Sequence, residues 1–204
     1  MEKKIFSAFL YNSELRFSEI EKYIGERSNK LAYYLDKLIK KGVLIKKQEK
    51  YKLSETAEEM IPYLTDKKSV LPVILISIEK NKEIFLIKRQ KRPFKNKLGL
   101  PGGRLLIGEK IPDAVKRIMK NKFQINAELQ KINSISLEHV KNPISKKIVH
   151  SFLLIFVNAK SKDNLNYTDI EKPETKKQII SSDYKLIKNN SNKKIDINQI
   201  ISKI

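Results

Sequence analysis

One short stretch of the chain, from Gly99 to Glu109, combines a tight turn with side chains that could contact a phosphorylated ligand. It reads Gly-Leu-Pro-Gly-Gly-Arg-Leu-Leu-Ile-Gly-Glu, and an amphipathic segment follows it to about Ile125. Carboxylate oxygens hold divalent cations such as Mg²⁺, whereas basic side chains pair with phosphates. Because Glu109 is the one carboxylate here and Arg104 lies in the same stretch, the residues favour direct contact with phosphate over a metal site.

This loop and the helix expected after it resemble the Nudix box. The motif runs Gly, five residues, Glu, seven residues, Arg-Glu, an aliphatic residue, any residue, Glu-Glu, any residue, Gly and an aliphatic residue. The positions in register are Gly103, Glu109, Arg117, Met119 and Ile125. Where the motif has its other three glutamates, this chain has Ile118, Asn121 and Lys122, and the late glycine is Gln124.

Those departures change the chemistry that the resemblance implies. In the Nudix family the paired glutamates hold a divalent metal beside a diphosphate, and the metal activates water for hydrolysis. Here the resemblance implies that the helix is kept and its metal site is lost, with Lys122 free to pair with a phosphate. The other interpretation is an accidental match to a loose pattern.

Basic residues gather around the box on the edge that faces the nucleotide diphosphate in Nudix proteins. Arginine suits two-pronged contact with phosphate, although each cation taken alone is equally well explained as surface charge. Phe94 could stack on a base but is expected in the core, and His139 and His150 are expected to be structural. The predicted ligand-binding residues are Arg89, Arg92, Gly102, Gly103, Arg104, Glu109 and Lys122.

The first third of the chain has the pattern of a small helical unit. Helical spacing of apolar residues begins near Ile5, and Phe17-Ser18 starts a second helix with Ser18 as N-cap and Glu21 as its capping-box partner. A third helix is expected from Ser28 to Lys41, with three leucines inward. Two short strands follow around a Gln48-Glu49 turn, and a last helix runs from Thr56 to about Leu64.

The segment from Ile20 to Leu53 resembles winged helix-turn-helix regulators, in which the third helix enters the DNA major groove and the wing touches the backbone. Residues 27–52 carry nine basic and two acidic side chains, a net charge of +7. The alternatives are a solvated charged face or a protein-binding module. The predicted DNA-binding residues are Arg27, Ser28, Asn29, Lys30, Tyr33, Tyr34, Lys37, Lys46, Lys47 and Lys50.

The second part of the chain reads as alternating strands around an early helix and a late helix. Strands are expected over 70–79, 83–88, 132–138, 147–157 and 184–187, loops over 163–177 and 188–194, and a terminal helix over 196–204. The fold class expected is therefore α+β with two domains: a winged helix-turn-helix over 1–66, then a Nudix-like α/β/α sandwich with a mixed β-sheet over 70–204.

Composition limits the classes of function. The formal net charge is +20 and favours an anionic partner, although a lysine-rich composition alone can produce such a charge. There is no cysteine, which excludes disulfides, cysteine nucleophiles and thiolate zinc sites and suits the cytoplasm. No apolar run approaches a membrane-spanning length, and no signal peptide is expected.

These observations predict a cytoplasmic DNA-binding transcriptional regulator, a homodimer on double-stranded DNA, whose degenerate Nudix domain senses a nucleotide-type metabolite such as ADP-ribose. No catalytic residue, metal ligand or cofactor is predicted. The first alternative is a divergent Nudix hydrolase of nucleoside diphosphate derivatives, with the winged helix as a targeting module. It would require Mg²⁺ or Mn²⁺ and further ligands, for which Glu171 and Glu174 are candidates. The second alternative is a protein-interaction adaptor.

Overall fold

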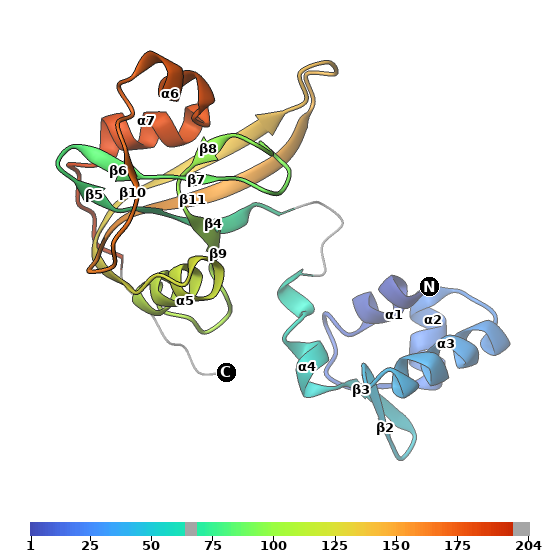
Figure 1. The fold of residues 1–204 in the computed structure, drawn as a ribbon. Coiled ribbons are helices and arrows are strands. Elements are labelled where there is room, and N and C mark those ends of the chain that lie inside the picture. Colours follow the sequence, from blue (N-terminus) through green and yellow to red (C-terminus); the bar gives the residue numbers. More distant parts are fainter. Residues whose placement is uncertain (64–68, 198–204) are drawn as a thin grey trace. The chain divides into compact units, whose positions relative to one another are not determined.

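The computed structural model describes residues 1–63 and 69–197 of the 204-residue chain. They form two compact units, Met1–Ser69 and Val70–Ile204 (Figure 1).

The N-terminal unit begins with three helices, which a β-hairpin follows. The helices are α1 (Glu2–Ala8), α2 (Phe17–Ile24) and α3 (Ser28–Lys40). In α3 the side chains of Leu31, Leu35 and Leu38 recur at helical spacing and are almost fully buried, as predicted. Gly25 ends α2 in the left-handed conformation, with φ of 69°, which glycine adopts without steric cost.

The start of α2 differs from the prediction. The helix begins at Phe17, so its N-cap is Arg16 and not Ser18. The carboxylate of Glu19, and not that of Glu21, accepts a hydrogen bond from the Arg16 backbone N–H at 2.6 Å. Ser18 therefore lies inside the first turn, because an acidic side chain one turn into the helix already satisfies the exposed N–H.

The hairpin after α3 agrees with the prediction. Strand β2 (Leu44–Lys47) pairs with β3 (Lys50–Leu53), and β3 also pairs with the two-residue strand β1 (Leu15–Arg16). Helix α4 (Glu55–Glu58) and a 3-10 turn (Ile61–Tyr63) follow. The expected helix over 56–64 is thus shorter and broken in the described part, and its last position lies outside the described residues.

A four-stranded mixed sheet forms the centre of the C-terminal unit, with strand order β10-β11-β4-β9. Strands β10 (Ala127–Lys141) and β11 (Ile148–Ser161) form a long antiparallel hairpin. Strand β4 (Leu71–Ser77) runs parallel to β11, and β9 (Gly102–Arg104) runs antiparallel to β4. Shorter strands flank the sheet: β5 (Glu79–Lys80), β6 (Glu83–Phe85), β7 (Ile87–Lys88), β8 (Leu98–Gly99) and β12 (Tyr167–Thr168).

Helices cover both faces of this sheet, which gives three layers. Helix α5 (Ile111–Phe123) lies on one face, and α6 (Pro173–Gln178) and α7 (Ser181–Asn190) lie on the other (Figure 1). Alternate residues of β4 follow this division: Ile74 and Ile76 pack in the core under α5, and Leu75 packs in the core under α7. Apolar burial on both faces supplies the main driving force for this arrangement.

The last part of the chain corrects three predictions. Residues 184–187, expected as a strand, lie inside α7, where Asp183, Leu186 and Ile187 are buried at helical spacing. The expected loop over 163–177 contains β12 and most of α6, and the expected loop over 188–194 begins as the end of α7. A short apolar run fits a strand or a helix equally well when its partners are distant in sequence. Of the expected terminal helix, positions 196 and 197 are not helical, and 198–204 lie outside the described residues.

Within the residues that the structure describes, no helix has the length and apolar character needed to cross a membrane.

Candidate phosphate-binding site

The turn before α5 is shaped by the close approach of that helix to β9. A Cβ at Gly103 would lie 2.9 Å from both Ile118 Cγ1 and Lys122 Nζ. A Cβ at Gly102 would lie 2.5 Å from the carbonyl oxygen of Ile74 on β4. Real Cβ atoms do not come so close to backbone atoms, so glycine is required at Gly102 for β9 to pair with β4, whereas at Gly103 a side chain would force Ile118 and Lys122 to shift.

Glu109 is engaged by an arginine in this structure. Its carboxylate accepts hydrogen bonds from Arg117 Nε and Nη2 at 2.5 and 2.8 Å, and from the Leu106 backbone N–H at 3.2 Å. The Arg117 guanidinium holds the pKa of Glu109 below its ordinary value. Arg117 Nη2 also donates to the Arg104 carbonyl at 2.9 Å. The pair therefore fastens the loop to α5.

Lys122 places a positive charge at the turn itself. Its Nζ donates to the Gly102 carbonyl oxygen at 2.7 Å. Burial lowers the pKa of Lys122, and the positive charges of Arg117, Arg89 and Lys91 lower it further. Lys122 and Arg117 therefore both donate to the backbone of β9, at Gly102 and Arg104, and positive charge there favours an anionic ligand.

None of the other three box positions supplies a carboxylate. Ile118 is fully buried in the core under α5, and Asn121 is exposed beside Lys122. Among the described residues, no group of three or more His, Asp and Glu side chains converges on a point. The side chains at the box therefore do not fit Mg²⁺ or Mn²⁺, which prefer carboxylate oxygens.

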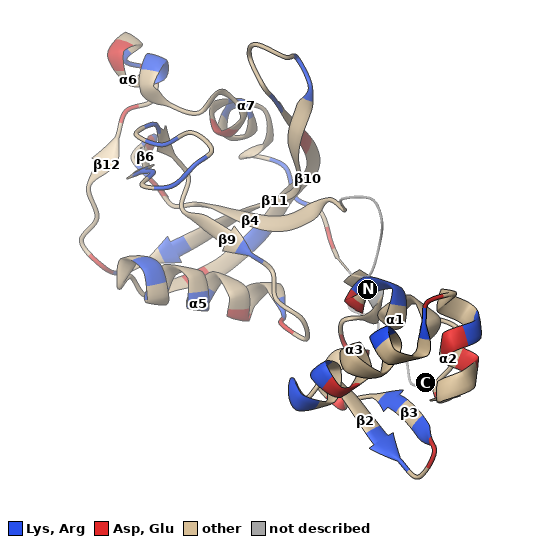
Figure 2. Ribbon diagram, turned by 90° about the vertical axis from the view of Figure 1, so that its right-hand side faces the viewer, with Lys and Arg blue, Asp and Glu red and all other residues tan. Residues whose placement is uncertain are grey.

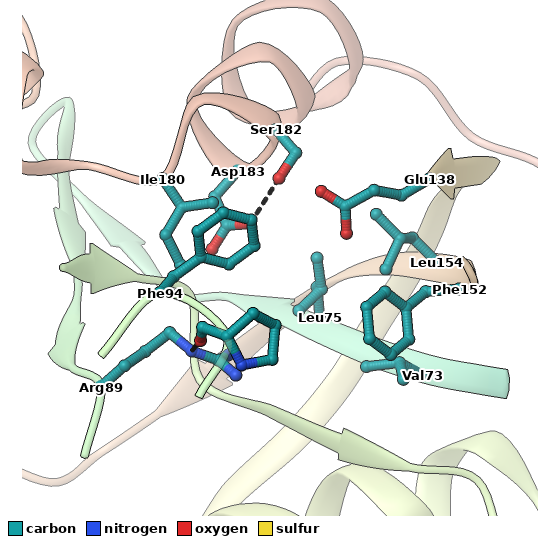
Figure 3. Close-up of a pocket in the computed structure, with 11 residues that line it drawn as sticks. Val73, Leu75, Arg89, Phe94, Glu138, Phe152, Leu154, Ile180, Ser182 and Asp183 are labelled. Carbon is teal, nitrogen blue, oxygen red and sulfur yellow. Dashed lines mark hydrogen bonds between the residues drawn. The ribbon is translucent and has the colours of Figure 1, made fainter. Parts of the chain in front are cut away.

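A pocket of about 90 Å³ lies on the α7 side of the sheet (Figure 3). Its apolar wall comes from β4 and β11, and Phe94 and Pro93 close it from the loop after β7. Arg89 lies at the same pocket, and its Nε donates to the Pro93 carbonyl at 3.2 Å. The lining residues are Val73, Leu75, Arg89, Pro93, Phe94, Glu138, Phe152, Leu154, Ile180, Ser182 and Asp183.

Asp183 is the buried acid of this pocket. It is 5% exposed, and its Oδ2 accepts the Leu100 backbone N–H at 2.8 Å. Burial raises the pKa of Asp183 to about 6, although the Leu100 hydrogen bond opposes the shift; the Glu138 charge adds to it and Arg89 opposes it. The carboxyl group therefore changes charge near pH 6 at the wall of this pocket, and such shifted acids are found at functional sites.

Sequence reasoning misses Asp183, because the pattern around it predicts a loop and a strand. A helical signal is nevertheless present: Ile179, Ile180, Asp183, Leu186 and Ile187 have helical spacing. Phe94 is a second correction. The sequence predicts it in the core, but it is 37% exposed and lines the pocket, because the loop after β7 turns its ring toward α7 and not into the sheet (Figure 3).

Two similarities to known proteins are visible at the level of sequence. Residues 68–179 match the family model described as "NUDIX domain", which is more than half of the chain. The chain belongs to the Nudix family. An ADP-ribose pyrophosphatase of Methanocaldococcus jannaschii is 31% identical over 85 residues, which is 42% of this chain. The match spans half the length of that protein.

Solved structures with a similar arrangement include two bacterial Nudix hydrolases. The protein from Nitrosomonas europaea has a TM-score of 0.47 and 15% identity, covering 59% of this chain and 87% of that one. The MutT Nudix hydrolase from Burkholderia pseudomallei has a TM-score of 0.44 and 15% identity, covering 59% of this chain and 98% of that one.

The family match confirms the predicted Nudix domain, and the three layers with a mixed sheet agree with the predicted fold. Within this domain Lys122 lies beside Gly102 and Gly103, whereas Glu109 contacts Arg117 at the other end of the loop, and Arg89 lies at the pocket. The Arg104 side chain is exposed on β9, and Arg92 is exposed in the loop after β7. Glu174 lies in α6 and Glu171 precedes it by two residues, and α6 covers the face of the sheet opposite to α5 (Figure 1); Glu171 accepts a hydrogen bond from Lys188 at 2.7 Å.

The predicted DNA-binding residues lie along α3 and the β2–β3 hairpin, where basic segments are visible in Figure 2. Several already face a carboxylate. Lys30 Nζ is 2.9 Å from Glu26, Lys37 Nζ is 3.1 Å from Glu2 and Lys50 Nζ is 3.1 Å from Glu14. The Ser28 hydroxyl donates to Glu21. Exposed ion pairs of this kind contribute little to stability.

The other predicted residues of this unit are more open. Arg27 is the N-cap of α3, and Asn29 is exposed in the first turn. Tyr33 is 62% exposed and packs edge to face against Tyr34, which is half-buried. Lys46 Nζ lies 5.4 Å from the centre of the Tyr51 ring, and Lys47 is exposed at the end of β2. A groove of about 470 Å³ runs beside the hairpin and the start of α2.

Proposed function

We propose that the Nudix domain binds a nucleoside diphosphate derivative of the ADP-ribose class without hydrolysing it. The observation that carries the proposal is the position of Lys122. Its ammonium group lies at the turn where the family's box has a metal-binding glutamate, 2.7 Å from the Gly102 carbonyl. An ammonium group there repels a divalent cation and attracts the phosphate that the cation would otherwise bridge.

The pocket beside Arg89 supports a ligand that carries more than phosphate. Arg89 joins the two regions, because its charge acts on both Lys122 and Asp183. The Phe94 ring and the buried carboxyl of Asp183 can contact the apolar face and the polar edge of a base or sugar. The similarity to an ADP-ribose pyrophosphatase favours ADP-ribose as the first compound to test.

We propose further that the N-terminal unit is a winged helix that binds duplex DNA, so that the whole protein is a nucleotide-responsive regulator. The hairpin carries Lys46 and Lys47 without a carboxylate in ion-pair range in the described part of the chain. Asn29 is exposed in the first turn of α3, and the N-terminal residues of a recognition helix are those that contact base edges in helix-turn-helix proteins. The binding of DNA rests on this charge and helix order, and the winged-helix assignment stays a prediction.

The second candidate function is hydrolysis of nucleoside diphosphate derivatives. Membership of the Nudix family and the pyrophosphatase relative favour it. The catalytic step would then need metal ligands other than the box glutamates.

Binding and turnover distinguish the two candidates. We expect ADP-ribose to bind the full chain in EDTA, measured by calorimetry, and Lys122→Met to weaken this binding about tenfold or more, as loss of a charge-assisted hydrogen bond does. Lys116→Met, on an exposed position of the same helix, is the matched control. In parallel, ADP-ribose, dinucleotides and nucleoside triphosphates are incubated with Mg²⁺ or Mn²⁺ and separated by chromatography. Turnover of roughly 1 per second or more would establish the hydrolase instead.

A further inference from the structure

A second basic surface lies in the Nudix domain, apart from the pocket and the turn. It is an open groove of about 620 Å³ between α5, the start of β10 and the end of β11. Four exposed lysines line it, which we call the groove lysines: Lys116, Lys120, Lys160 and Lys162. None of them lines the pocket beside Asp183.

The floor of the groove is held in place by hydrogen bonds. The Asn126 backbone N–H donates to Asp163 at 2.6 Å, and the Ser161 hydroxyl donates to the Asn126 carbonyl at 2.7 Å. The carboxylate of Asp163 is therefore engaged in fixing the backbone. The other carboxylate is that of Glu128. Its side chain is 68% exposed, and its Oε2 lies 4.0 Å from Lys160 Nζ, which is the outer limit of an ion pair.

The lysines themselves remain largely available to a ligand. Lys120 Nζ donates to Asn126 Oδ1 at 3.3 Å, a long bond to a neutral group. Lys116 and Lys162 have no hydrogen-bond or ion-pair partner among the described residues. Four cations against two carboxylates leave a positive field along an open surface, which attracts a chain of phosphates.

The side chains that line the groove indicate which phosphate-containing ligand it suits: a duplex, a single strand or a compact diphosphate. Among the described residues that line the groove, none is aromatic or arginine. Single strands are held by bases stacked on aromatic rings, and a compact diphosphate is best gripped by the two-pronged arginine side chain. Lysines on an open surface suit the repeated phosphates of a duplex, which are contacted without reading the sequence.

We propose that the groove lysines form a sequence-independent contact surface for the phosphate backbone of duplex DNA. This inference goes beyond the proposed function, because it assigns DNA contact to the Nudix domain itself. The surface would add backbone contacts to those of the N-terminal unit when both engage one duplex.

The test measures binding of the full chain to a random-sequence duplex as a function of salt. A variant with all four groove lysines changed to Gln is compared with a control that loses the same charge at Lys82, Lys141, Lys146 and Lys147. We expect the groove variant to lower the slope of log affinity against log salt by about 0.9 for each phosphate contact that the substitutions remove. The control variant should keep a slope close to that of the unmodified chain.

The following outcomes separate the possibilities. Equal slopes for the groove and control variants would overturn the inference. Stronger binding of a single strand than of the duplex, or saturable binding of tripolyphosphate that the groove variant abolishes while duplex binding persists, would also overturn it. A loss of duplex binding in Lys46→Ala/Lys47→Ala but not in the groove variant would leave the proposed function standing without this surface. A loss of duplex binding in the groove variant but not in Lys46→Ala/Lys47→Ala would support DNA contact by the groove lysines and count against DNA binding by the winged helix.

Discussion

At the scale of single residues, Glu109 and Lys122 each form a contact that fixes the turn before α5. Glu109 binds Arg117, and Lys122 binds the Gly102 carbonyl. Position 122 corresponds to one of the paired glutamates of the Nudix motif, and in this chain it is a lysine. In this chain the Glu109 carboxylate and Arg117 hold the loop before α5, and the Lys122 ammonium group joins α5 to β9.

The pair of Glu109 and Arg117 predicts a measurable structural role. Glu109→Gln should lower the free energy of unfolding by about 1–3 kcal/mol, because the hydrogen bonds it removes are charge-assisted and the Glu109 side chain is only 12% exposed. Urea denaturation measures this, and Glu128→Gln, at an exposed carboxylate, should change stability by less than about 0.5 kcal/mol. If Glu109 instead ligates a metal, Mg²⁺ would stabilise the unmodified protein and not the variant.

Asp183 predicts a dependence of stability on pH. Its pKa is about 6 in the folded protein and about 3.9 in an unfolded chain. Between these values the folded state holds a proton that the unfolded state has released, so stability falls as pH rises toward 6 and the loss is complete above it. Asp183→Asn removes this ionisation. Relative to the unmodified protein, the free energy of unfolding of the variant should therefore be higher at pH 8 than at pH 4 by up to about 3 kcal/mol.

Urea denaturation at both pH values checks the Asp183 prediction. The matched control is Asp113→Asn, at an exposed carboxylate in the first turn of α5. A pH-dependence of Asp183→Asn that parallels that of the unmodified protein and of the control would show that the Asp183 carboxyl is not shifted.

At the scale of elements, each of the two units has one helix that buries an apolar face and has basic side chains on it or next to it. In the N-terminal unit, α3 packs its leucines inward and leaves Asn29 and Tyr33 exposed, next to the basic β2–β3 hairpin. In the Nudix domain, α5 buries Ile118 and Met119 and places Lys122 at the turn. The buried face of each helix fixes which side chains face a ligand.

The hairpin predicts how DNA binding responds to salt. Lys46→Ala/Lys47→Ala should reduce the salt slope by about 0.9 for each phosphate that the variant no longer touches, because these lysines are expected to meet the backbone. Asn29→Ala or Lys30→Ala should instead reduce the preference for a specific site over random duplex. Lys82→Ala/Lys147→Ala removes equal charge elsewhere. Fluorescence anisotropy across a salt series gives both quantities, and unchanged binding in a variant lacking all four N-terminal side chains would contradict the winged-helix proposal.

At the scale of the whole molecule, two units with separate cores share one chain, so a ligand of one unit can act on the other only through their coupling. If the proposed effector changes the affinity for DNA, the same factor must appear in the affinity for the effector when DNA is bound. We expect ADP-ribose to change the DNA dissociation constant by at least about fivefold, measured by anisotropy. Equal DNA affinities with and without ADP-ribose would show that ADP-ribose does not regulate DNA binding.

A homodimer is the second prediction at this scale. One winged helix covers one half-site, and two copies related by symmetry would match a palindromic operator. Sedimentation equilibrium at micromolar protein should therefore give twice the chain mass of 23.8 kDa. A single chain mass with and without DNA would refute the dimer.

The sequence by itself determined those elements whose signals are local. Leucines at helical spacing and a closing glycine specify α3, the polar turn between short strands specifies the hairpin, and the Gly, Glu, Arg and aliphatic spacing specifies the Nudix turn and α5. It also showed that Ile118, Asn121 and Lys122 replace the box carboxylates. These features depend on residues within a few turns of one another.

Only the tertiary structure decided what depends on distant partners. The segment 184–187 is helical because its apolar side chains pack under the sheet. Asp183 becomes a buried acid because it accepts the N–H of Leu100, 83 residues earlier. The groove lysines converge because the end of β11 returns to the start of β10 beside α5. Such contacts are set by burial and hydrogen bonding across the fold, which no short sequence window contains.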